Sequence, residues 1–164
     1  MMAWNANWLQ EKGPLPMNKS ITKVYIASDH RGVGLKLYLI EMLSAAGYAV
    51  VNLGTDDPTV KVDFPEITRR ATDAMSTDPA SRGIVICGFG GGVVIAANRF
   101  RHIRATRCFQ PDHARHDRIH DDTNVLALAA EDIELEIAMM TAQAFLETPF
   151  DAIERRIRRI QEIS

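Results

Sequence analysis

A cysteine followed by a run of glycines is the feature of this sequence that most directly predicts chemistry. Cys87 ends an apolar run, and four of the next five residues are glycine. Backbone N–H groups in such a segment can approach an anion closely, and they favour the ionised form of a nearby thiol. A thiolate at this position could remove a proton from carbon or attack it. The alternative interpretation is a buried structural cysteine beside a tight turn, because cysteine is common in protein cores.

Titratable side chains at two other places could take part in the same chemistry. His120 and Asp121 precede an apolar run, where an imidazole that titrates near neutrality can donate or accept a proton. Asp29 and His30 directly follow another apolar run, and they could bind the hydroxyl groups of a polyol or an anionic group. Asp29 is equally compatible with an N-cap that precedes a helix.

Three histidines raise the question of a metal site. His113, His116 and His120 share one face if their segment is helical. Ligands from successive turns of one helix converge poorly on a metal ion, and the flanking Asp and Arg residues are typical of a solvated face. We therefore expect no metal.

The C-terminal segment contains a candidate anion-binding pair. Arg155 and Arg159 are one turn apart in a basic amphipathic segment, so together they could hold a phosphate or a carboxylate. The default interpretation of such a segment is a solvated basic face.

The glycine-rich segment departs from the common cofactor and phosphate motifs. A G-x-G-x-x-G dinucleotide fingerprint would need glycine where Val93 or Ile95 stands. A phosphatase loop of the Cys-x5-Arg type would need arginine in place of Val93, and no G-K-[ST] sequence follows. The sequence therefore indicates no cofactor and none of the usual machinery of phosphoryl transfer.

Composition limits the class of protein and its partners. The chain has 164 residues, of which 46% are hydrophobic and 24% charged, as in one soluble globular domain. The formal net charge of -2 provides no field that would attract nucleic acid or an anionic membrane. Two cysteines are too few for a disulfide framework, which favours the cytoplasm. The uncharged stretch 83–97 is shorter than the roughly 20 apolar residues of a membrane-spanning helix.

Short β-rich runs alternate with longer amphipathic runs, which predicts strand–helix units and a mainly parallel sheet. Residues 1–21 lack the layout of a secretory signal and are interpreted as an N-terminal extension of a domain that spans 22–164. The fold class that we predict is α/β, a three-layer α/β/α arrangement around a five-stranded Rossmann-like sheet. The predicted strands are Lys23–Ser28, Tyr48–Leu53, Gly83–Cys87, Ile103–Cys108 and Asn124–Ala129. One predicted helix begins at Val33. The others cover Pro65–Ser76, Gly91–Arg99, Asp112–His120, Asp132–Glu147 and Asp151–Ile163.

Several short motifs in a fixed order resemble one family. They are Ser28-Asp29-His30, Asp63-Phe64-Pro65, the Gly83–Gly92 segment around Cys87, Ile95-Ala96-Ala97-Asn98, and His120-x-Asp122-Thr123-Asn124-Val125-Leu126. This pattern resembles the ribose-5-phosphate isomerase B family, which also includes the galactose-6-phosphate isomerase subunits. The resemblance extends from Lys23 to the C-terminus.

The resemblance implies a metal-independent aldose–ketose isomerase that acts on a sugar or sugar phosphate. It implies a homodimer or a dimer of dimers with pockets built across the subunit interface. Cys87 would move a proton between C2 and C1 through an enediolate, and His120 would open the sugar ring. Asp29 and His30 would hold the substrate, with Asp121 beside it. The oxyanion would be stabilised by backbone N–H groups of Gly88, Phe89, Gly90, Gly91 and Gly92.

Three positions depart from the family pattern. Phe89 replaces a threonine, Asp121 replaces an asparagine, and Glu131 occupies the position of an arginine that contacts phosphate. Two of these changes add negative charge, so the preferred substrate could be another sugar phosphate or an unphosphorylated sugar. The phosphate-binding arginines of the family align either with Arg155 and Arg159 or with Glu154 and Arg158.

Two other functions compete with isomerisation. A hydrolase would use Cys87 as nucleophile and His120 as base, and it would show an acyl-enzyme burst. A sugar-binding protein that kept the fold would bind without turnover.

Overall fold

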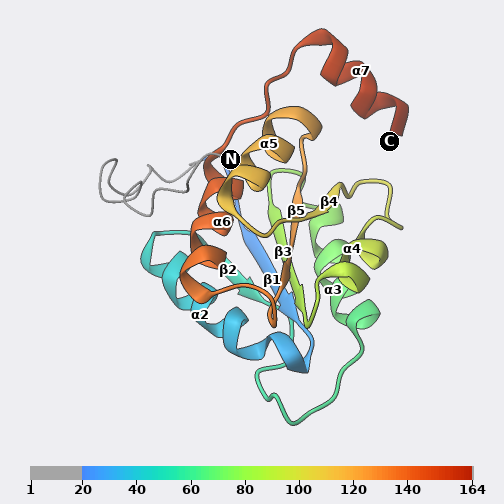
Figure 1. Ribbon diagram of the computed structural model, residues 1–164. Helices are drawn as coiled ribbons and strands as arrows, with labels where there is room; N and C mark the ends of the chain where they lie inside the picture. Colours follow the sequence, from blue (N-terminus) through green and yellow to red (C-terminus); the bar gives the residue numbers. More distant parts are fainter. Residues whose placement is uncertain (1–19, 164) are drawn as a thin grey trace.

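The structure is a single parallel sheet with helices on both faces (Figure 1). The computed structural model describes residues 20–163, so most of the expected extension, 1–19, lies outside the described residues. The strand order is β2-β1-β3-β5-β4, and each neighbouring pair is parallel. The strands are β1 (Val24–Ser28), β2 (Val50–Asn52), β3 (Arg82–Cys87), β4 (Ala105–Arg107) and β5 (Val125–Ala129).

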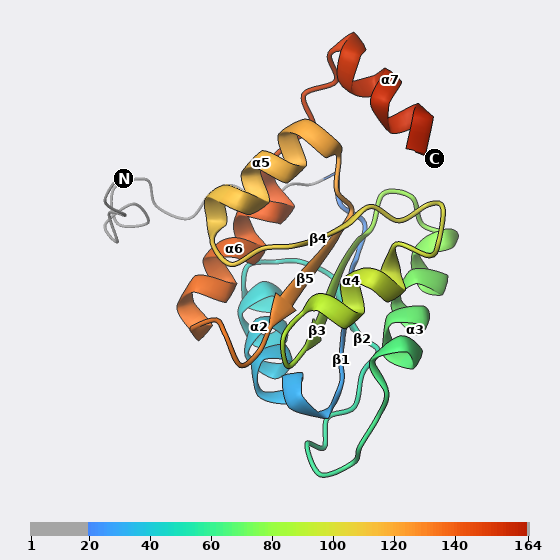
Figure 2. The same ribbon diagram turned by 45° about the vertical axis from the view of Figure 1, so that its right-hand side comes forward.

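The helices form two layers, one on each side of the sheet (Figures 1 and 2). Helices α2, α5 and α6 pack on one face and bury Leu39 and Phe145, while α3 and α4 pack on the other and bury Ile67 and Val93. This confirms the predicted three-layer α/β/α fold. The helices are η1 (His30–Gly32), α2 (Val33–Ala45), α3 (Phe64–Ser76), α4 (Gly91–Ala97), α5 (Pro111–Asp121), α6 (Leu135–Glu147) and α7 (Glu154–Ile163).

The side chains of β3 alternate between the two cores. Ile84 and Ile86 lie in the core under α2 and α6, whereas Val85 and Cys87 lie in the core under α3 and α4. Because successive residues of a strand point to opposite faces, this register fixes the face on which the Cys87 thiol lies.

The two edge strands are shorter than the sequence predicts. Strands β2 and β4 have three residues each, whereas the apolar runs around them suggested six. Tyr48 and Cys108 are buried although they lie outside these strands, so burial extends beyond the ladder of strand hydrogen bonds. The predicted helix Gly91–Arg99 ends earlier, at Ala97.

A buried lysine ties α2 to the segment after β2. The side chain of Lys36 is fully buried, and its Nζ donates to Asn52 Oδ1 at 2.8 Å, to the Thr55 carbonyl at 2.6 Å and to Asp56 Oδ1 at 2.5 Å. Each ammonium proton therefore has an acceptor, as a buried charge requires.

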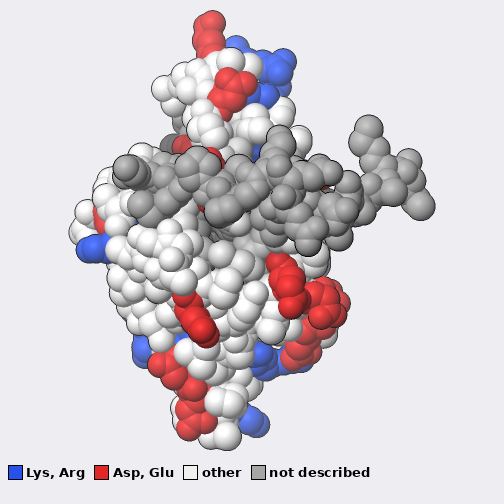
Figure 3. All heavy atoms as spheres, turned by 90° about the vertical axis from the view of Figure 1, so that its left-hand side faces the viewer, with Lys and Arg blue, Asp and Glu red and all other residues white. Residues whose placement is uncertain are grey.

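Helix α7 extends away from the rest of the molecule, at the end of the sheet where α5 ends (Figures 1 and 2). Its Ile157 is exposed, as is Ile153 just before it. Figure 3 shows a group of basic side chains together with acidic ones at the tip formed by α7, and further acidic and basic groups on the rest of that face. No helix within residues 20–163 combines the length and apolar character needed to cross a bilayer.

Candidate functional site

Cys87 ends β3 at the carboxyl edge of the sheet and touches the glycine loop that follows. The side chain is buried and free, and its Sγ accepts a hydrogen bond from the Gly90 N–H at 3.1 Å. Gly90 has a φ of 73°, a left-handed conformation that glycine adopts without strain. This turn directs the amide toward the sulfur, an arrangement that stabilises negative charge on it.

An ion pair from two distant segments covers the start of this loop. Both guanidinium nitrogens Nε and Nη2 of Arg31 donate to the carboxylate of Glu131. The guanidinium carbon lies 5.3 Å from the centre of the Phe89 ring, and a Cβ at Gly88 would come within 2.8 Å of it. Glycine at position 88 is therefore needed for the arginine to lie against the loop.

The charge of Glu131 is compensated, which corrects one expectation from the sequence. Replacement of an arginine by Glu131 suggested extra negative charge at the site. In the structure Arg31 pairs with it through two hydrogen bonds, so the two charges cancel. The pairing was not apparent from the sequence because the partners are 100 residues apart.

Asp29 lies beside this pair and acts as an N-cap. Its Oδ1 accepts from the backbone N–H groups of Arg31 at 2.9 Å and Gly32 at 3.2 Å, which confirms the capping interpretation. The side chain of Asp29 is buried, and the neighbouring His30 has a buried Nδ1 without a hydrogen-bond partner in the described structure. Since buried polar atoms are rarely left without partners, Nδ1 is a candidate contact for a ligand.

His120 lies at the opposite edge of the sheet from Cys87, where edge means one end of the parallel strands: Cys87 is at their carboxyl ends and His120 is near their amino ends. Cys87 pairs with Ala129 at the end of β5, whereas Asn124, only four residues after His120, bonds to Gly83 at the start of β3. The intervening strand is about 13 Å long. Figures 1 and 2 show α5 ending at one end of the sheet and the turn from β3 to α4 at the other. Within one chain, Cys87 and His120 therefore do not share a pocket.

The surroundings of the His120 imidazole favour its neutral form. Its ring stacks on His116 with centroids 4.2 Å apart, and Arg156 Nη2 lies 3.0 Å from its Nδ1. Arg156 Nη2 also lies 3.3 Å from Nε2, and because a guanidinium can only donate, the ring nitrogen that accepts from it carries no proton. Loss of hydration lowers the pKa of His120 below its usual 6.5, and the positive charge of Arg156 lowers it further, against the opposing effect of Asp121.

The Asp-Thr-Asn sequence after Asp121 builds the turn that places His120. Asp122 has a φ of 46° and binds two arginines, Arg118 at 2.8 Å and Arg104 at 2.6 Å. Asn124 accepts from the Arg104 N–H at 2.8 Å and donates to the His102 carbonyl. These residues connect α5 to the start of the sheet, so their role is to position the end of α5.

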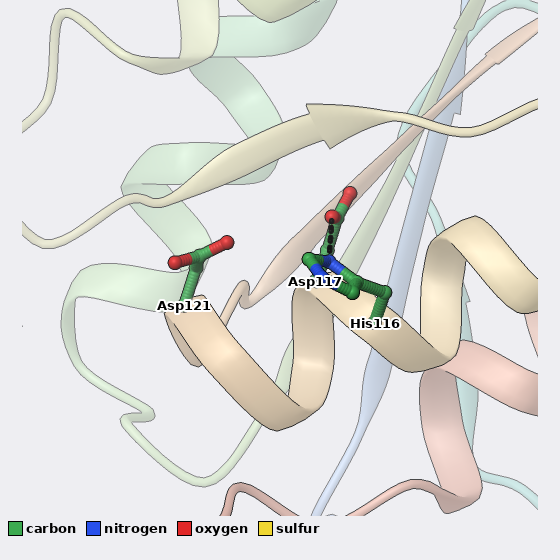
Figure 4. Close-up of side chains that lie close together, drawn as sticks. All are labelled: His116, Asp117 and Asp121. Carbon is green, nitrogen blue, oxygen red and sulfur yellow. Dashed lines mark hydrogen bonds and ion pairs between the residues drawn. The ribbon is translucent and has the colours of Figure 1, made fainter. Parts of the chain in front are cut away.

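Asp121 lies in a small group of metal-compatible side chains on α5. Ligand atoms of His116, Asp117 and Asp121 lie within 4.8 Å of one another (Figure 4). Asp117 already accepts from Thr106 Oγ1 at 2.6 Å, and His116 lies against it at 3.4 Å. His113 does not belong to this group, because its Nε2 is bonded to Gln110. A partly exposed group of this kind is not sufficient to assign a metal site.

The arginines of α7 differ in their surroundings. Arg155 and Arg159, the candidate phosphate-binding pair, are exposed, and Arg158 pairs with Glu162 at 3.7 Å. Arg156 is the buried member, bound to Asp151 and to His120. Sequence reasoning overlooked Arg156, and its position on the inner face of an amphipathic helix was the signal that could have identified it.

Comparison with known proteins identifies the family. Residues 24–163 match the model of a family described as Ribose/Galactose Isomerase. The chain belongs to this family. Ribose-5-phosphate isomerase B of Escherichia coli is 34% identical over 142 residues, 87% of this chain and 94% of that protein.

Solved structures of the ribose/galactose isomerase family have the same fold. Ribose 5-phosphate isomerase B of Thermotoga maritima matches with a TM-score of 0.81 and 40% identity, covering 87% of this chain and 99% of that one. The Mycoplasma genitalium enzyme, solved with bound ribulose-5-phosphate, matches with a TM-score of 0.81 and 32% identity over 86% of this chain and 93% of that one. The resemblance seen in the sequence is confirmed, and the class of enzyme is an aldose–ketose isomerase.

Proposed function

We propose that this enzyme interconverts an aldose phosphate and its ketose, of the ribose 5-phosphate and ribulose 5-phosphate type, with Cys87 as the base. The observation that supports the role of Cys87 is its buried sulfur at the carboxyl edge of the sheet, hydrogen-bonded to Gly90 in the glycine loop. Ligands of parallel α/β sheets bind at this edge.

In the proposed reaction, the Cys87 thiolate removes the proton from C2 of the open-chain sugar. The electrons of the C2–H bond form the C1–C2 double bond, and the carbonyl electrons move onto O1, where N–H groups of the Gly88–Gly92 loop stabilise the charge. The Cys87 thiol then returns the proton to C1, and the O2 proton moves to O1 to leave a ketone at C2. His30 and the free oxygen of Asp29 hold substrate hydroxyls. His120 donates its ring N–H proton to the ring oxygen as the C1–O bond breaks, and the anomeric hydroxyl returns a proton to the same nitrogen.

The proposed active site is assembled from two copies of the chain in a homodimer. Cys87 and His120 lie at opposite edges of the sheet, and Ile153 just before α7 and Ile157 within it are exposed next to the edge that carries His120. A twofold arrangement brings the Cys87 edge of one copy to the His120 edge of the other and forms two equal sites. Arg155 and Arg159 would enter the same sites from α7 as phosphate ligands, with Asp121 beside His120.

A phosphorylated sugar is favoured over a free sugar. One of the two added negative charges, that of Glu131, is cancelled by Arg31. The remaining changes, Phe89 and Asp121, alter the shape and local polarity of the pocket and leave the basic groups of α7 in place. The two free cysteines are in keeping with a reducing compartment, and we place the enzyme in the cytoplasm.

The decisive experiment is a panel of aldoses and aldose phosphates assayed in deuterated water. We expect exchange at C2 or C1 together with ketose formation by the wild-type enzyme, and loss of both in Cys87→Ala. A strong preference for free ribose over ribose 5-phosphate would refute the phosphorylated substrate. An unchanged rate of ketose formation in Cys87→Ala would refute the mechanism.

Mixing two inactive variants tests the shared site. Cys87→Ala and His120→Ala are each expected to be inactive alone. After dissociation and reassociation of an equal mixture, half of the dimers contain one chain of each kind, and one of their two sites has both native residues. About a quarter of wild-type activity should return if copies pair at random. No recovery, despite formation of mixed dimers, would place both residues in one chain's site.

A further inference from the structure

Two arginines contact the glycine loop in the described part of the chain, and they differ in charge balance. Arg31 is neutralised by Glu131. Arg107 has no carboxylate partner among the described residues, and its contacts are with a backbone carbonyl and an aromatic ring. Arg107 therefore contributes a full positive charge beside the loop, and the sequence analysis did not identify it.

Arg107 lies on the same face of the sheet as Cys87. It is the last residue of β4 and pairs with Ala127, which belongs with Cys87 to the core under α3 and α4. A Cβ at Gly90 would come within 2.8 Å of Arg107 Cδ, so the arginine stem crosses this glycine. The same Gly90 donates its N–H to Cys87 Sγ. A single residue thus separates the arginine from the proposed base.

The guanidinium of Arg107 is held in place, but one hydrogen bond in the described structure uses only one of its five N–H donors. Its Nη1 donates to the Phe89 carbonyl at 2.8 Å, and its carbon lies 4.6 Å from the centre of the Phe109 ring. Arginine has five N–H donors in a planar fork that matches phosphate and carboxylate oxygens. The side chain is exposed, so the other donors are available to a ligand at the loop.

We propose that Arg107 is a specificity-determining residue that binds an oxyanion group of the substrate, a phosphate or a carboxylate, beside the Cys87 loop. This inference rests on the proposed function, because it assumes that the loop is where the sugar binds. It adds a recognition element from β4 to the groups already assigned from β1, β3 and α7. Sugars without an anionic group gain nothing from this residue.

The test compares two substitutions at this position. Arg107→Gln keeps an N–H donor but removes the charge, whereas Arg107→Lys keeps the charge. The probes are inorganic phosphate and an unphosphorylated five-carbon aldonate, with affinities measured by calorimetry on the full chain. Arg69→Gln, an exposed arginine on α3, is the matched control for loss of one surface charge.

We expect Arg107→Gln to lose about tenfold or more in affinity for one of the two probes. Arg107→Lys should keep most of that affinity, and Arg69→Gln should keep all of it. The probe that loses affinity identifies the oxyanion as phosphate or carboxylate. Equal affinities of wild type and Arg107→Gln for both probes would overturn the inference, as would equal losses in the Gln and Lys variants, which would indicate a role in holding the Phe89 carbonyl.

Activity separates this inference from the proposed function. If the wild type isomerises a sugar phosphate while Arg107→Gln binds both probes normally, the inference fails and the function stands. If Arg107→Gln loses phosphate affinity but the wild type isomerises no sugar, the anion site stands and the proposed function fails.

Discussion

The Arg31–Glu131 pair predicts opposite effects of two single substitutions on the binding of an anionic substrate. Glu131→Gln leaves the Arg31 charge uncompensated at the glycine loop, so binding should strengthen. Arg31→Gln leaves the Glu131 carboxylate uncompensated, so binding should weaken. The double variant removes both charges and should bind as the wild type does, because the pair is already neutral.

The expected size of these effects follows from the exposure of the pair. The side chains of Arg31 and Glu131 are 45% and 38% exposed, so solvent screens them strongly. One uncompensated charge about 8 Å from a substrate anion, at an effective dielectric constant of about 40–80, is worth about 0.5–1 kcal/mol. Each single variant should therefore change affinity about two- to fivefold, and the two should differ from each other by about 5–25-fold. The pair itself should contribute only about 0.2–1 kcal/mol to stability.

The assay is competitive inhibition by inorganic phosphate, repeated at low and high ionic strength. The difference between the single variants should shrink between about 50 mM and 500 mM salt, because partly exposed charges are screened over a few ångströms at high salt. Equal inhibition constants in the two single variants would refute the reasoning, since they would mean that the pair does not face the bound anion. A double variant that differs from the wild type would indicate that the pair acts through shape rather than charge.

Three further predictions concern stability and proton binding. Lys36→Met should lower the free energy of unfolding by about 1–3 kcal/mol, measured by urea denaturation, because the three hydrogen bonds from the buried lysine to the 52–56 segment are lost. The pKa of His120, measured by NMR titration, should lie below 6.5 and should rise toward that value in Arg156→Met. Because unfolding returns His120 to its ordinary pKa, its contribution to stability should fall as pH drops below about 6.5, and a pKa above 6.5 would contradict this. Gly90→Ala should cost about 1–2 kcal/mol from its left-handed backbone, whereas Gly91→Ala, whose Cβ would meet Arg107 Nη1 at an ordinary contact distance of 4.0 Å, should be nearly neutral.

The features that sequence predicted well are those encoded locally. The buried strands β1, β3 and β5 appear as continuous apolar runs, and their predicted bounds agree with the structure to within one residue. The loop after Cys87 is encoded by its glycines, because only glycine tolerates the conformation at position 90 without strain. The N-cap at Asp29 was one of two interpretations, and the local hydrogen bonds decide in its favour.

The features that sequence could not predict depend on contacts between distant segments. Arg31 and Glu131 meet only because β1 and β5 both flank β3 in the sheet. Arg107 approaches the loop because β4 lies next to β5, an order that the chain does not reveal. The separation of Cys87 from His120, in contrast, could have been predicted, since one residue ends a strand and the other precedes one in a parallel sheet.

In the proposed mechanism, each of the two edges of the sheet supplies half of an active site. At the carboxyl edge, Cys87 has amide support and His30 has a buried nitrogen without a hydrogen-bond partner in the described structure, while the proposed mechanism assigns ring opening to His120. At the other edge, Arg156 and the Asp122 turn hold His120 at the surface, apart from Cys87 of its own chain. Holding these side chains in place costs conformational entropy that the fold must offset. In the proposed mechanism an isolated chain gains no catalytic activity in return. If two copies pair about a twofold axis, the Cys87 edge of one copy meets the His120 edge of the other, and both edges gain a role. The mixed-variant experiment tests this pairing directly, so it tests more of the proposal than any single substitution.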